Sequence, residues 1–235
     1  MAEDRTAEHW LVTGANRGLG LELTRRIAAR GGRVTACVRD EAARETLART
    51  LAPFSDRIKT LAFDQRDGAA IRAAAAAHDG PLDVLVANAG AFGPQRQTPL
   101  DLDFAGALDL FEVNSLGPLR VAEAFLPALR KTRAPRLAFV SSELGSMALT
   151  GASSIAYRAS KAALNKYMQG LALEVRTHGI CVVSLHPGWV RTDMGGPNAP
   201  LSVEESGAGM IRVLDGLTMA DTGRFLDYRG ETVAW

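Results

Sequence analysis

The sequence predicts an α/β fold, a doubly wound parallel sheet of about seven strands with helices on both faces. Short apolar segments alternate along the chain with longer Ala-, Leu- and Arg-rich segments of helical period. This order is typical of parallel sheets with right-handed crossovers. The apolar residues of the short segments are continuous rather than alternating, as in strands that are covered on both faces. No repeat or linker divides the chain, so we expect one domain over residues 1–235.

The predicted elements follow one another in a regular order. Apolar segments rich in β-formers predict strands at residues 10–12, 33–38, 59–63, 83–87, 136–140 and 181–185, with a short one near residues 223–226. Segments of helical period predict helices at residues 19–30, 41–51, 69–78, 108–131, 157–177 and 203–214. Gly- and Pro-rich residues 195–200 follow the sixth strand, and we expect a loop there. It would lie over the carboxyl edge of the sheet, where open α/β sheets bind ligands.

Composition and charge exclude several classes of protein. With 47% hydrophobic and 23% charged residues, the composition is that of a globular protein and not of a disordered chain. The net charge of +1 gives no basic footprint for nucleic acid. No apolar run is long enough to span a membrane, and the polar start MAEDRTAEH is no secretory signal. Cys37 and Cys181 have no paired spacing, so we expect reduced core thiols, no metal site and a cytoplasmic location.

A glycine-rich turn joins the first strand to the first helix. Its glycines are Gly14, Gly18 and Gly20, and the residues that we expect to bind with them are Asn16, Arg17 and Leu19. Glycines let the backbone approach a pyrophosphate, whose charge is met by amide groups and by the helix dipole. The turn lacks the Lys-Ser/Thr of a Walker loop, which favours a dinucleotide over a nucleoside triphosphate. The alternative is a glycine cluster that serves backbone geometry alone.

The end of the second strand indicates which dinucleotide binds. An acidic residue there would accept hydrogen bonds from the ribose of NAD(H), but the chain has Val38 followed by Arg39. Arg17 could reach the same place, and two guanidinium groups suit a 2′-phosphate. We therefore expect NADP(H) to be preferred, with NAD(H) possible. The alternative is that Arg39 is a surface arginine beside Asp40, which we expect to cap the second helix.

Tyr157 and Lys161 are four residues apart at the start of a predicted helix and project from one face of it. An ammonium group beside a phenol favours the phenolate and lowers the phenol pKa from about 10. Such a tyrosine can donate a proton to a carbonyl oxygen or remove one from an alcohol. Tyr-x-x-x-Lys also occurs on exposed helices. The pair therefore indicates a catalytic site only together with the other motifs of the chain.

Polar residues end two other strands at the same edge. Ser141 and Ser142 follow the fifth strand, where a hydroxyl can hydrogen-bond a substrate carbonyl, or can simply cap the strand. No G-x-S-x-G elbow is present, which argues against a hydrolase. Asn88-Ala89-Gly90 follows the fourth strand and lets the backbone lie close to a cofactor. Asn114, inside a predicted helix, marks either a bend with a function or a tolerated surface amide.

These motifs, in this order, resemble the short-chain dehydrogenase/reductase family over essentially the whole chain, and the fold is therefore expected to be Rossmann-type. The family's glycine motif falls on Gly14, Gly18 and Gly20, and its Asn-Ala-Gly motif falls on Asn88, Ala89 and Gly90. The catalytic tetrad that the resemblance implies is Asn114, Ser142, Tyr157 and Lys161. In the family, tyrosine is the acid/base, lysine lowers its pKa and binds the nicotinamide ribose, serine orients the carbonyl, and asparagine holds a relay water.

The resemblance also implies further cofactor contacts: Asp64 at the adenine, and Pro187, Gly188, Val190 and Thr192 near the nicotinamide. The segments YRASKAALN and HPGWVRTDMGGPNAPLSVEES are similar to the C-factor-like and carbonyl-reductase-like subgroup, which often uses NADP(H). Ser142 and Tyr157 are farther apart than in most members. Residues 147–154 are therefore expected to form a longer loop on the substrate side.

The expected function is that of an NADP(H)-dependent oxidoreductase, a reductase of ketones or aldehydes that can also oxidise alcohols. The apolar residues expected to contact the small-molecule substrate are Phe92, Met147, Trp189 and Met194. An epimerase or dehydratase is disfavoured, because the chain has no second substrate domain. The alternative function is a low-turnover signalling or regulatory protein that binds the cofactor. The resemblance also implies a homodimer or homotetramer that pairs through the helices at residues 108–131 and 157–177.

Overall fold

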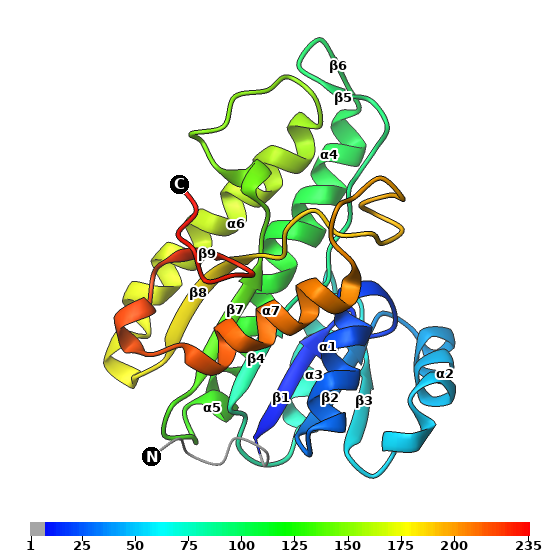
Figure 1. The fold of residues 1–235 in the computed structure, drawn as a ribbon, viewed down its shortest axis with the longest axis vertical. Helices are drawn as coiled ribbons and strands as arrows, with labels where there is room; N and C mark the ends of the chain where they lie inside the picture. Colours follow the sequence, from blue (N-terminus) through cyan, green and yellow to red (C-terminus); the bar gives the residue numbers. More distant parts are fainter. Residues whose placement is uncertain (1–7) are drawn as a thin grey trace.

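The centre of the computed structural model, which describes residues 8–235, is a seven-stranded parallel sheet (Figure 1). Its strands are β1 (His9–Thr13), β2 (Arg33–Val38), β3 (Ile58–Ala62), β4 (Val84–Ala87), β7 (Arg136–Val140), β8 (Cys181–His186) and β9 (Phe225–Asp227). They lie in the order β3-β2-β1-β4-β7-β8-β9. Successive strands are added to one side of β1 up to β3 and to its other side from β4 onward, so the strand order reverses between β1 and β4. Sheets of this kind bind ligands at that point. The predicted fold class and all seven predicted strands are confirmed.

Helices cover both faces of the sheet, as predicted. They are α1 (Gly18–Ala29), α2 (Glu41–Thr50), α3 (Gly68–Ala76), α4 (Phe104–Phe111), α5 (Gly117–Leu129), α6 (Ile155–Glu174) and α7 (Val203–Gly216). Figure 1 shows α1 and α7 side by side on one face, and α3, α5 and α6 pack on the other. Alternate residues of β1 serve the two cores, Trp10 and Val12 on one face and Leu11 on the other.

Two local predictions from residue type are also confirmed. The Asp40 carboxylate accepts a hydrogen bond from Ala43 N (2.9 Å) and caps α2. Cys37 and Cys181 are buried free thiols. Residues 1–7, expected to carry no secretory signal, lie outside the described part of the chain.

The single helix predicted over residues 108–131 is wrong. The chain forms α4 from Phe104, then a π-type turn, η3 (Glu112–Leu116), and then α5. Asp103 starts α4 by accepting a hydrogen bond from Gly106 N (3.0 Å). Pro118 has no N–H for the Asn114 carbonyl, four residues earlier, so the regular α-helical hydrogen bond is missing at this point.

Two short features were not predicted. A hairpin of β5 (Gln97–Thr98) and β6 (Asp101–Leu102) stands between β4 and α4. After β9 the chain turns back along that edge strand, where Val233 N donates to Phe225 O (2.8 Å) and Asp227 N donates to Glu231 O (2.8 Å). Residues 228–235, which we call the C-terminal strap, thus cover the edge of the sheet.

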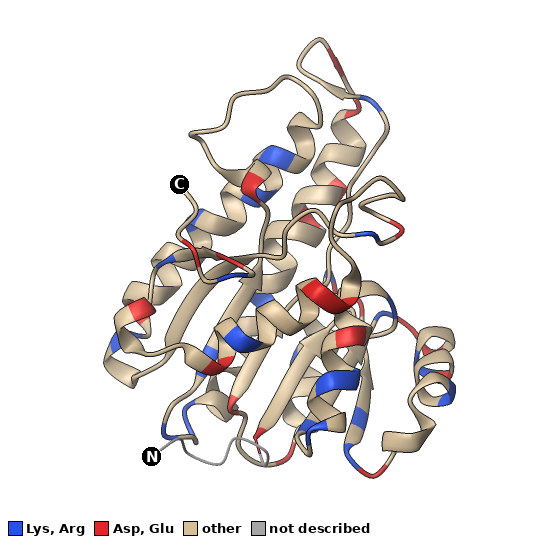
Figure 2. Ribbon diagram, in the orientation of Figure 1, with Lys and Arg blue, Asp and Glu red and all other residues tan. Residues whose placement is uncertain are grey.

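Basic and acidic residues are interspersed along the helices and loops (Figure 2). Among residues 8–235 the helices are too short or too polar to cross a lipid bilayer.

Candidate active site

The carboxyl ends of four neighbouring strands bring the predicted site together. The glycine turn follows β1, Asn88-Ala89-Gly90 follows β4, and Ser141-Ser142 follows β7. Pro187 and Gly188 follow β8, and the loop from there runs to α7. All of these segments therefore lie at one edge of the sheet, on both sides of the point where the strand order changes direction.

The glycine turn has the shape that close approach to a ligand requires. Gly14 and Gly18 have positive φ angles of 65° and 51°, and a Cβ atom on Gly20 would lie 2.1 Å from the Gly14 carbonyl oxygen. Helix α1 begins at Gly18 without a side-chain cap and without an acidic residue in its first turn. Its first N–H groups and the positive end of its dipole are therefore free to meet an anion.

Thr13 fixes the glycine turn against Asn88-Ala89-Gly90. Its hydroxyl oxygen accepts hydrogen bonds from Asn88 N (3.0 Å) and Ala89 N (2.9 Å), and Asn88 Nδ2 donates to Thr13 O (2.9 Å). Gln65 Nε2 in turn donates to Ala89 O (3.3 Å) and to Val113 O in η3 (2.6 Å). Neither Thr13 nor Gln65 was predicted, because both act through residues that are distant in sequence.

The loop after β8 closes over the glycine turn. Thr192 lies against Gly18, where a Cβ atom would be 3.4 Å from the Thr192 methyl carbon. The Asp193 carboxylate binds Arg17 Nη1 at 3.1 Å. Val190 pairs with Leu201 as an isolated parallel bridge, and Ser206 Oγ donates to Pro187 O (2.6 Å). Thr192 and Asp193 therefore lie against the glycine turn, and the predicted cofactor contacts of residues 187–192 stay a prediction.

Arg17 and Arg39, which are expected to favour NADP(H) over NAD(H), each form an ion pair with a different carboxylate. Arg17 binds Asp193, and Arg39 Nε binds Asp40 at 3.2 Å; the two guanidinium side chains are 69% and 75% exposed. Exposed pairs of this kind are worth at most about 1 kcal/mol, so a phosphate can displace them. Asp64 is bound by Arg66 (2.7 Å), whose hydrogen bonds hold the pKa of the Asp64 carboxyl below its usual value.

Ser142 and Tyr157 are in contact in a buried place. The Ser142 hydroxyl lies close enough to the Tyr157 phenol to act on its pKa, and it accepts from Leu144 N (3.2 Å). Burial raises the pKa of Tyr157 above its usual value, and Ser142 acts in the opposite direction. The phenol therefore keeps its proton near neutral pH and is suited to donate it. The Ser141 hydroxyl is buried and has no partner within residues 8–235.

Lys161 brings a buried cation to the same place. Its Nζ donates to Val140 O (2.8 Å) and lies 5.9 Å from the centre of the Tyr157 ring. Burial lowers the pKa of Lys161 to about 8, since the ammonium loses hydration. A lysine with this pKa is mostly charged at neutral pH. The prediction that it lowers the pKa of Tyr157 is wrong for this structure, because burial raises that pKa and Lys161 is not among the groups that shift it.

Asn114 is fully buried in η3, so the alternative of a surface amide is wrong. Its Oδ1 accepts from Ala91 N (2.9 Å), and its Nδ2 donates to Ala91 O (2.8 Å) and Ser160 Oγ (3.0 Å). A Cβ atom on Gly90 would lie 3.1 Å from Asn114 Oδ1 and 3.6 Å from Lys161 Nζ. Asn114 and Lys161 therefore both lie beside Gly90, and a larger residue there would crowd them.

Of the four predicted substrate contacts, Phe92 lies against the tetrad. Its ring centre is 5.0 Å from that of Tyr157, and 43% of the residue is exposed. Met147, Trp189 and Met194 are exposed on the surrounding loops, and Trp189 Nε1 donates to Gly195 O (2.8 Å). Met147 belongs to the non-helical segment before α6, where a longer loop was expected.

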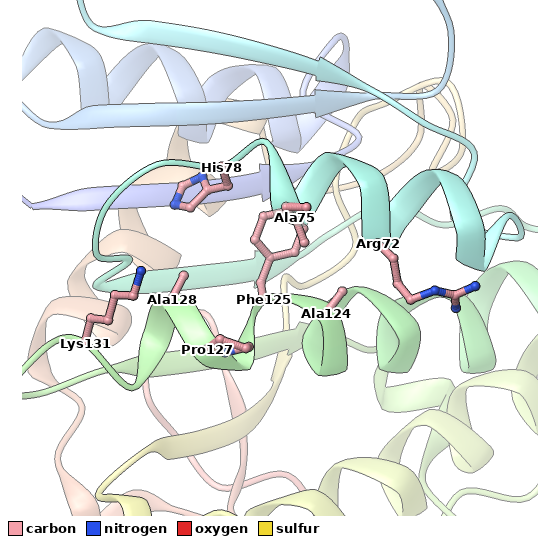
Figure 3. Close-up of a pocket in the computed structure, with 9 residues that line it drawn as sticks. Arg72, Ala75, His78, Ala124, Phe125, Pro127, Ala128 and Lys131 are labelled. Atoms are coloured by element: carbon pink, nitrogen blue, oxygen red, sulfur yellow. The ribbon is translucent and has the colours of Figure 1, made fainter.

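A second feature lies away from this edge. A groove of about 250 Å³ lies between α3 and α5 and shares no residue with the predicted site. Figure 3 shows the residues that line it. Its lining combines small apolar residues with basic ones: Arg72, Ala75, Ala76, His78, Ala124, Phe125, Pro127, Ala128 and Lys131. Within residues 8–235, His, Cys, Asp and Glu side chains form no group of three that could hold a metal ion.

Known proteins are similar to this chain in sequence and in fold. Residues 8–200 match the sequence model of the family described as short chain dehydrogenase. The chain is 48% identical over 157 residues to the C-signal protein of Myxococcus xanthus. The aligned region covers 66% of this chain and 94% of that protein. It is similar in structure to the NADPH-bound carbonyl reductase from chicken fatty liver, with a TM-score of 0.89 and 33% identity over 97% of this chain and 99% of that chain. A carbonyl reductase from Pseudomonas aeruginosa in complex with NADP gives a TM-score of 0.82 and 34% identity over 97% and 100% of the two chains.

Proposed function

The chain belongs to the short-chain dehydrogenase family, and we propose that within it this protein is an NADP(H)-dependent reductase of small ketones or aldehydes. One observation carries the proposal: Ser142, Tyr157 and Lys161 meet beside the glycine turn, with the tyrosine and lysine buried. Two similar structures are carbonyl reductases, one bound to NADPH and the other in complex with NADP, which supports the carbonyl substrate and the choice of cofactor.

The residues present fit a dinucleotide. The Gly14 carbonyl oxygen leaves no room for a side chain on Gly20, and positive φ angles disfavour side chains on Gly14 and Gly18. The uncapped start of α1 offers N–H groups to a pyrophosphate. Arg17 and Arg39 would hold a 2′-phosphate, and Asp64 would lie at the adenine. Asn88-Ala89-Gly90 and the segment with Pro187, Gly188, Val190 and Thr192 would border the nicotinamide side. When bound, the dinucleotide supplies a hydride to the carbonyl carbon of the substrate.

The tetrad would donate a proton to the substrate carbonyl oxygen and stabilise the negative charge that develops on that oxygen. Ser142 and Tyr157 donate hydrogen bonds to the substrate carbonyl oxygen, and Tyr157 gives up its phenolic proton to that oxygen. The Lys161 ammonium stabilises the phenolate that remains, in a site where burial strengthens the interaction. Asn114 would hold a water that returns a proton through Lys161. Alcohol oxidation uses the same residues in the reverse direction.

The similarity to the C-signal protein favours a second candidate function, a cofactor-binding signalling protein with little turnover. A protein that only binds has no need of a buried Tyr157 beside a buried Lys161, because both groups lose hydration on burial. The tetrad therefore favours the enzyme.

Loss of NADPH absorbance with a panel of ketones, aldehydes and quinones tests the proposal. We expect turnover by the wild type, and a loss of more than about 1,000-fold in Tyr157→Phe with NADPH affinity unchanged. Tyr167→Phe, on the same helix, is the matched control and should keep full activity. An inactive wild type that binds NADPH would favour the signalling function, and an active Tyr157→Phe would contradict the assigned acid/base. Equal affinities for NADPH and NADH would contradict the preference for NADP(H).

The homodimer or homotetramer that the family resemblance implies also belongs to this proposal. Leu108 on α4 and Leu173 on α6 are each 72% exposed, and both stand on the helices that are expected to pair. Light scattering on the purified protein measures the mass of the particle directly.

A further inference from the structure

Gln97 lies at the junction of the substrate side and the catalytic helix, although it belongs to none of the predicted motifs. It is the first residue of β5, and it is 4% exposed. Its Oε1 accepts a hydrogen bond from Tyr157 N (3.0 Å), and its Nε2 donates to Phe92 O (3.0 Å) and Pro94 O (2.6 Å). The buried Gln97 carboxamide therefore joins two segments: its oxygen binds the start of α6, and its NH₂ group binds the chain after β4.

The contact with Tyr157 replaces a missing helix cap. Tyr157 is the third residue of α6, where backbone N–H groups have no partner within the helix. Ser154, at the cap position, has left-handed φ and ψ angles of 54° and 35° and makes no side-chain capping bond. Gln97, which is 60 residues away in sequence, supplies the acceptor instead. The backbone of Tyr157 is therefore anchored from outside its own helix.

The same carboxamide anchors the aromatic wall beside Tyr157. It holds the carbonyls of Phe92 and Pro94, and the Phe92 ring lies 5.0 Å from the Tyr157 ring at an interplanar angle of 33°. Because Phe92 is partly exposed, a substrate that reaches Tyr157 passes beside its ring. The Gln97 carboxamide thus binds both the backbone that carries the Phe92 ring and the backbone that carries the Tyr157 phenol.

We propose that Gln97 is the positioning residue that fixes Tyr157 relative to Ser142 and sets the distance between Tyr157 and Phe92. This inference rests on the proposed function, in which Tyr157 is the acid/base. Gln97 touches neither substrate nor cofactor in this role. It orders the proton donor and the adjacent wall through their backbones. Small displacements of such groups can cost about 100-fold in rate.

Gln97→Met, which keeps the size and removes all three hydrogen bonds, is the first test in the full-length protein with NADPH. We expect kcat for a small ketone to fall by about 10- to 100-fold, with NADPH affinity unchanged. Gln97→Glu, at a pH where the carboxylate is ionised, still accepts from Tyr157 N but cannot donate to the two carbonyls. For this variant we expect kcat for the small ketone to be largely kept and KM for a bulky aryl ketone to change several-fold. Gln95→Met, an exposed glutamine in the same segment, is the matched control.

Hydrogen exchange of the Tyr157 amide gives a readout that does not depend on turnover. We expect this amide to be protected in the wild type and in Gln97→Glu, and to exchange faster in Gln97→Met. An unprotected Tyr157 amide in the wild type, or unchanged kcat and KM in both variants of an active enzyme, would overturn the proposal. An inactive wild type with a protected amide that Gln97→Met exposes would contradict the proposed function and leave the anchoring role standing.

Discussion

Burial of the Lys161 ammonium lowers the stability of the folded protein and places a positive charge beside Tyr157. Its Nζ is buried with a single backbone acceptor, Val140 O, and its pKa falls from 10.5 to about 8. At neutral pH the folded protein therefore holds a charge that water would solvate better. From this pKa difference the cost is about 3 kcal/mol at pH 7. A structural lysine would avoid this cost by reaching solvent, so the burial fits a group that is kept for its charge.

We predict that Lys161→Met loses carbonyl reduction and changes how stability depends on pH. Between pH 8 and 10.5 the unfolded wild type binds a proton that the folded wild type does not, so wild-type stability rises with pH relative to the variant. The difference in unfolding free energy should shift in favour of the wild type by about 2–3 kcal/mol between pH 7 and pH 10. Urea unfolding of both proteins at the two pH values measures it. Lys166→Met, at an exposed position of the same helix, should show no such shift.

The π-type turn η3 and the hairpin β5–β6 build the site in places where local patterns are weak. Asn114 reaches Ala91 and Ser160 from η3, which interrupts a segment whose apolar spacing is that of one long helix. The hairpin consists of two-residue strands that carry Gln97 and Asp101, so neither length nor apolar alternation marks it. The hairpin is held by contacts across the fold that no local pattern marks, whereas η3 has a signal in the sequence, Pro118, which the prediction of one long helix did not use.

The elements that were predicted owe their signal to burial on both faces. Trp10, Leu11 and Val12 must all be apolar because the sheet has a core on each side, and the other central strands follow the same rule. Within the site, Tyr157 and Lys161 could be found because helical spacing places them together. Thr13 and Gln97 could not be found, because their partners lie 75 and 60 residues away.

The C-terminal strap connects the edge of the sheet to the substrate side. The Trp235 ring stacks on Phe225 at 5.4 Å, and its carbonyl oxygen accepts from Ala148 N (3.1 Å) in the loop before α6. Figure 1 shows this end of the chain near that loop. The strap therefore holds one side of the loop that carries Met147, while Arg158 holds the other through Ser153 O (3.1 Å).

We predict that Trp235→Ala frees this loop without damaging the tetrad. Loss of the stacked ring should cost about 1–3 kcal/mol of stability and release the contact with Ala148. Amide exchange over residues 147–151 should rise, and KM for a bulky ketone should change several-fold while kcat for a small one is kept. Phe104→Ala removes an exposed aromatic side chain elsewhere and is the control. Unchanged exchange in the loop would show that the strap does not hold it.

At the scale of the whole molecule, the two ends of the sheet have different tasks. The carboxyl ends of the strands carry the glycine turn and Ser142, and Asn114, Tyr157 and Lys161 reach the same edge from η3 and α6. The other end is closed by packing that includes His9 at the start of β1 and His78 beyond α3, with ring centres 5.0 Å apart. Figure 3 shows His78 and Lys131 at the same end of the groove between α3 and α5.

These histidines make the stability of the molecule sensitive to acid. His9 Nε2 is hydrogen-bonded with Thr35 Oγ1 (2.8 Å) and Nδ1 with Pro81 O (3.2 Å), which suits a neutral ring. Burial, followed by His78 and Arg33, lowers the pKa of His9 from 6.5 to about 4, although Asp83 acts in the opposite direction. Burial and the nearby Lys59 and Lys131 also lower the pKa of His78. In acid the unfolded chain therefore binds protons that the folded chain excludes.

We predict that stability falls as the pH drops from about 6.5 to 4, with His9 contributing up to about 3 kcal/mol of the loss. His9→Gln, which keeps a hydrogen-bonding side chain but cannot take up a proton, should be less stable than the wild type at pH 7. Its unfolding free energy should also fall less steeply in acid, so the two proteins approach each other near pH 4. Urea unfolding across this range measures both slopes, and His178→Gln, at an exposed position, should keep the wild-type slope. Parallel slopes for wild type and His9→Gln would show that acid acts elsewhere, since only a group that changes its pKa on folding can link stability to pH.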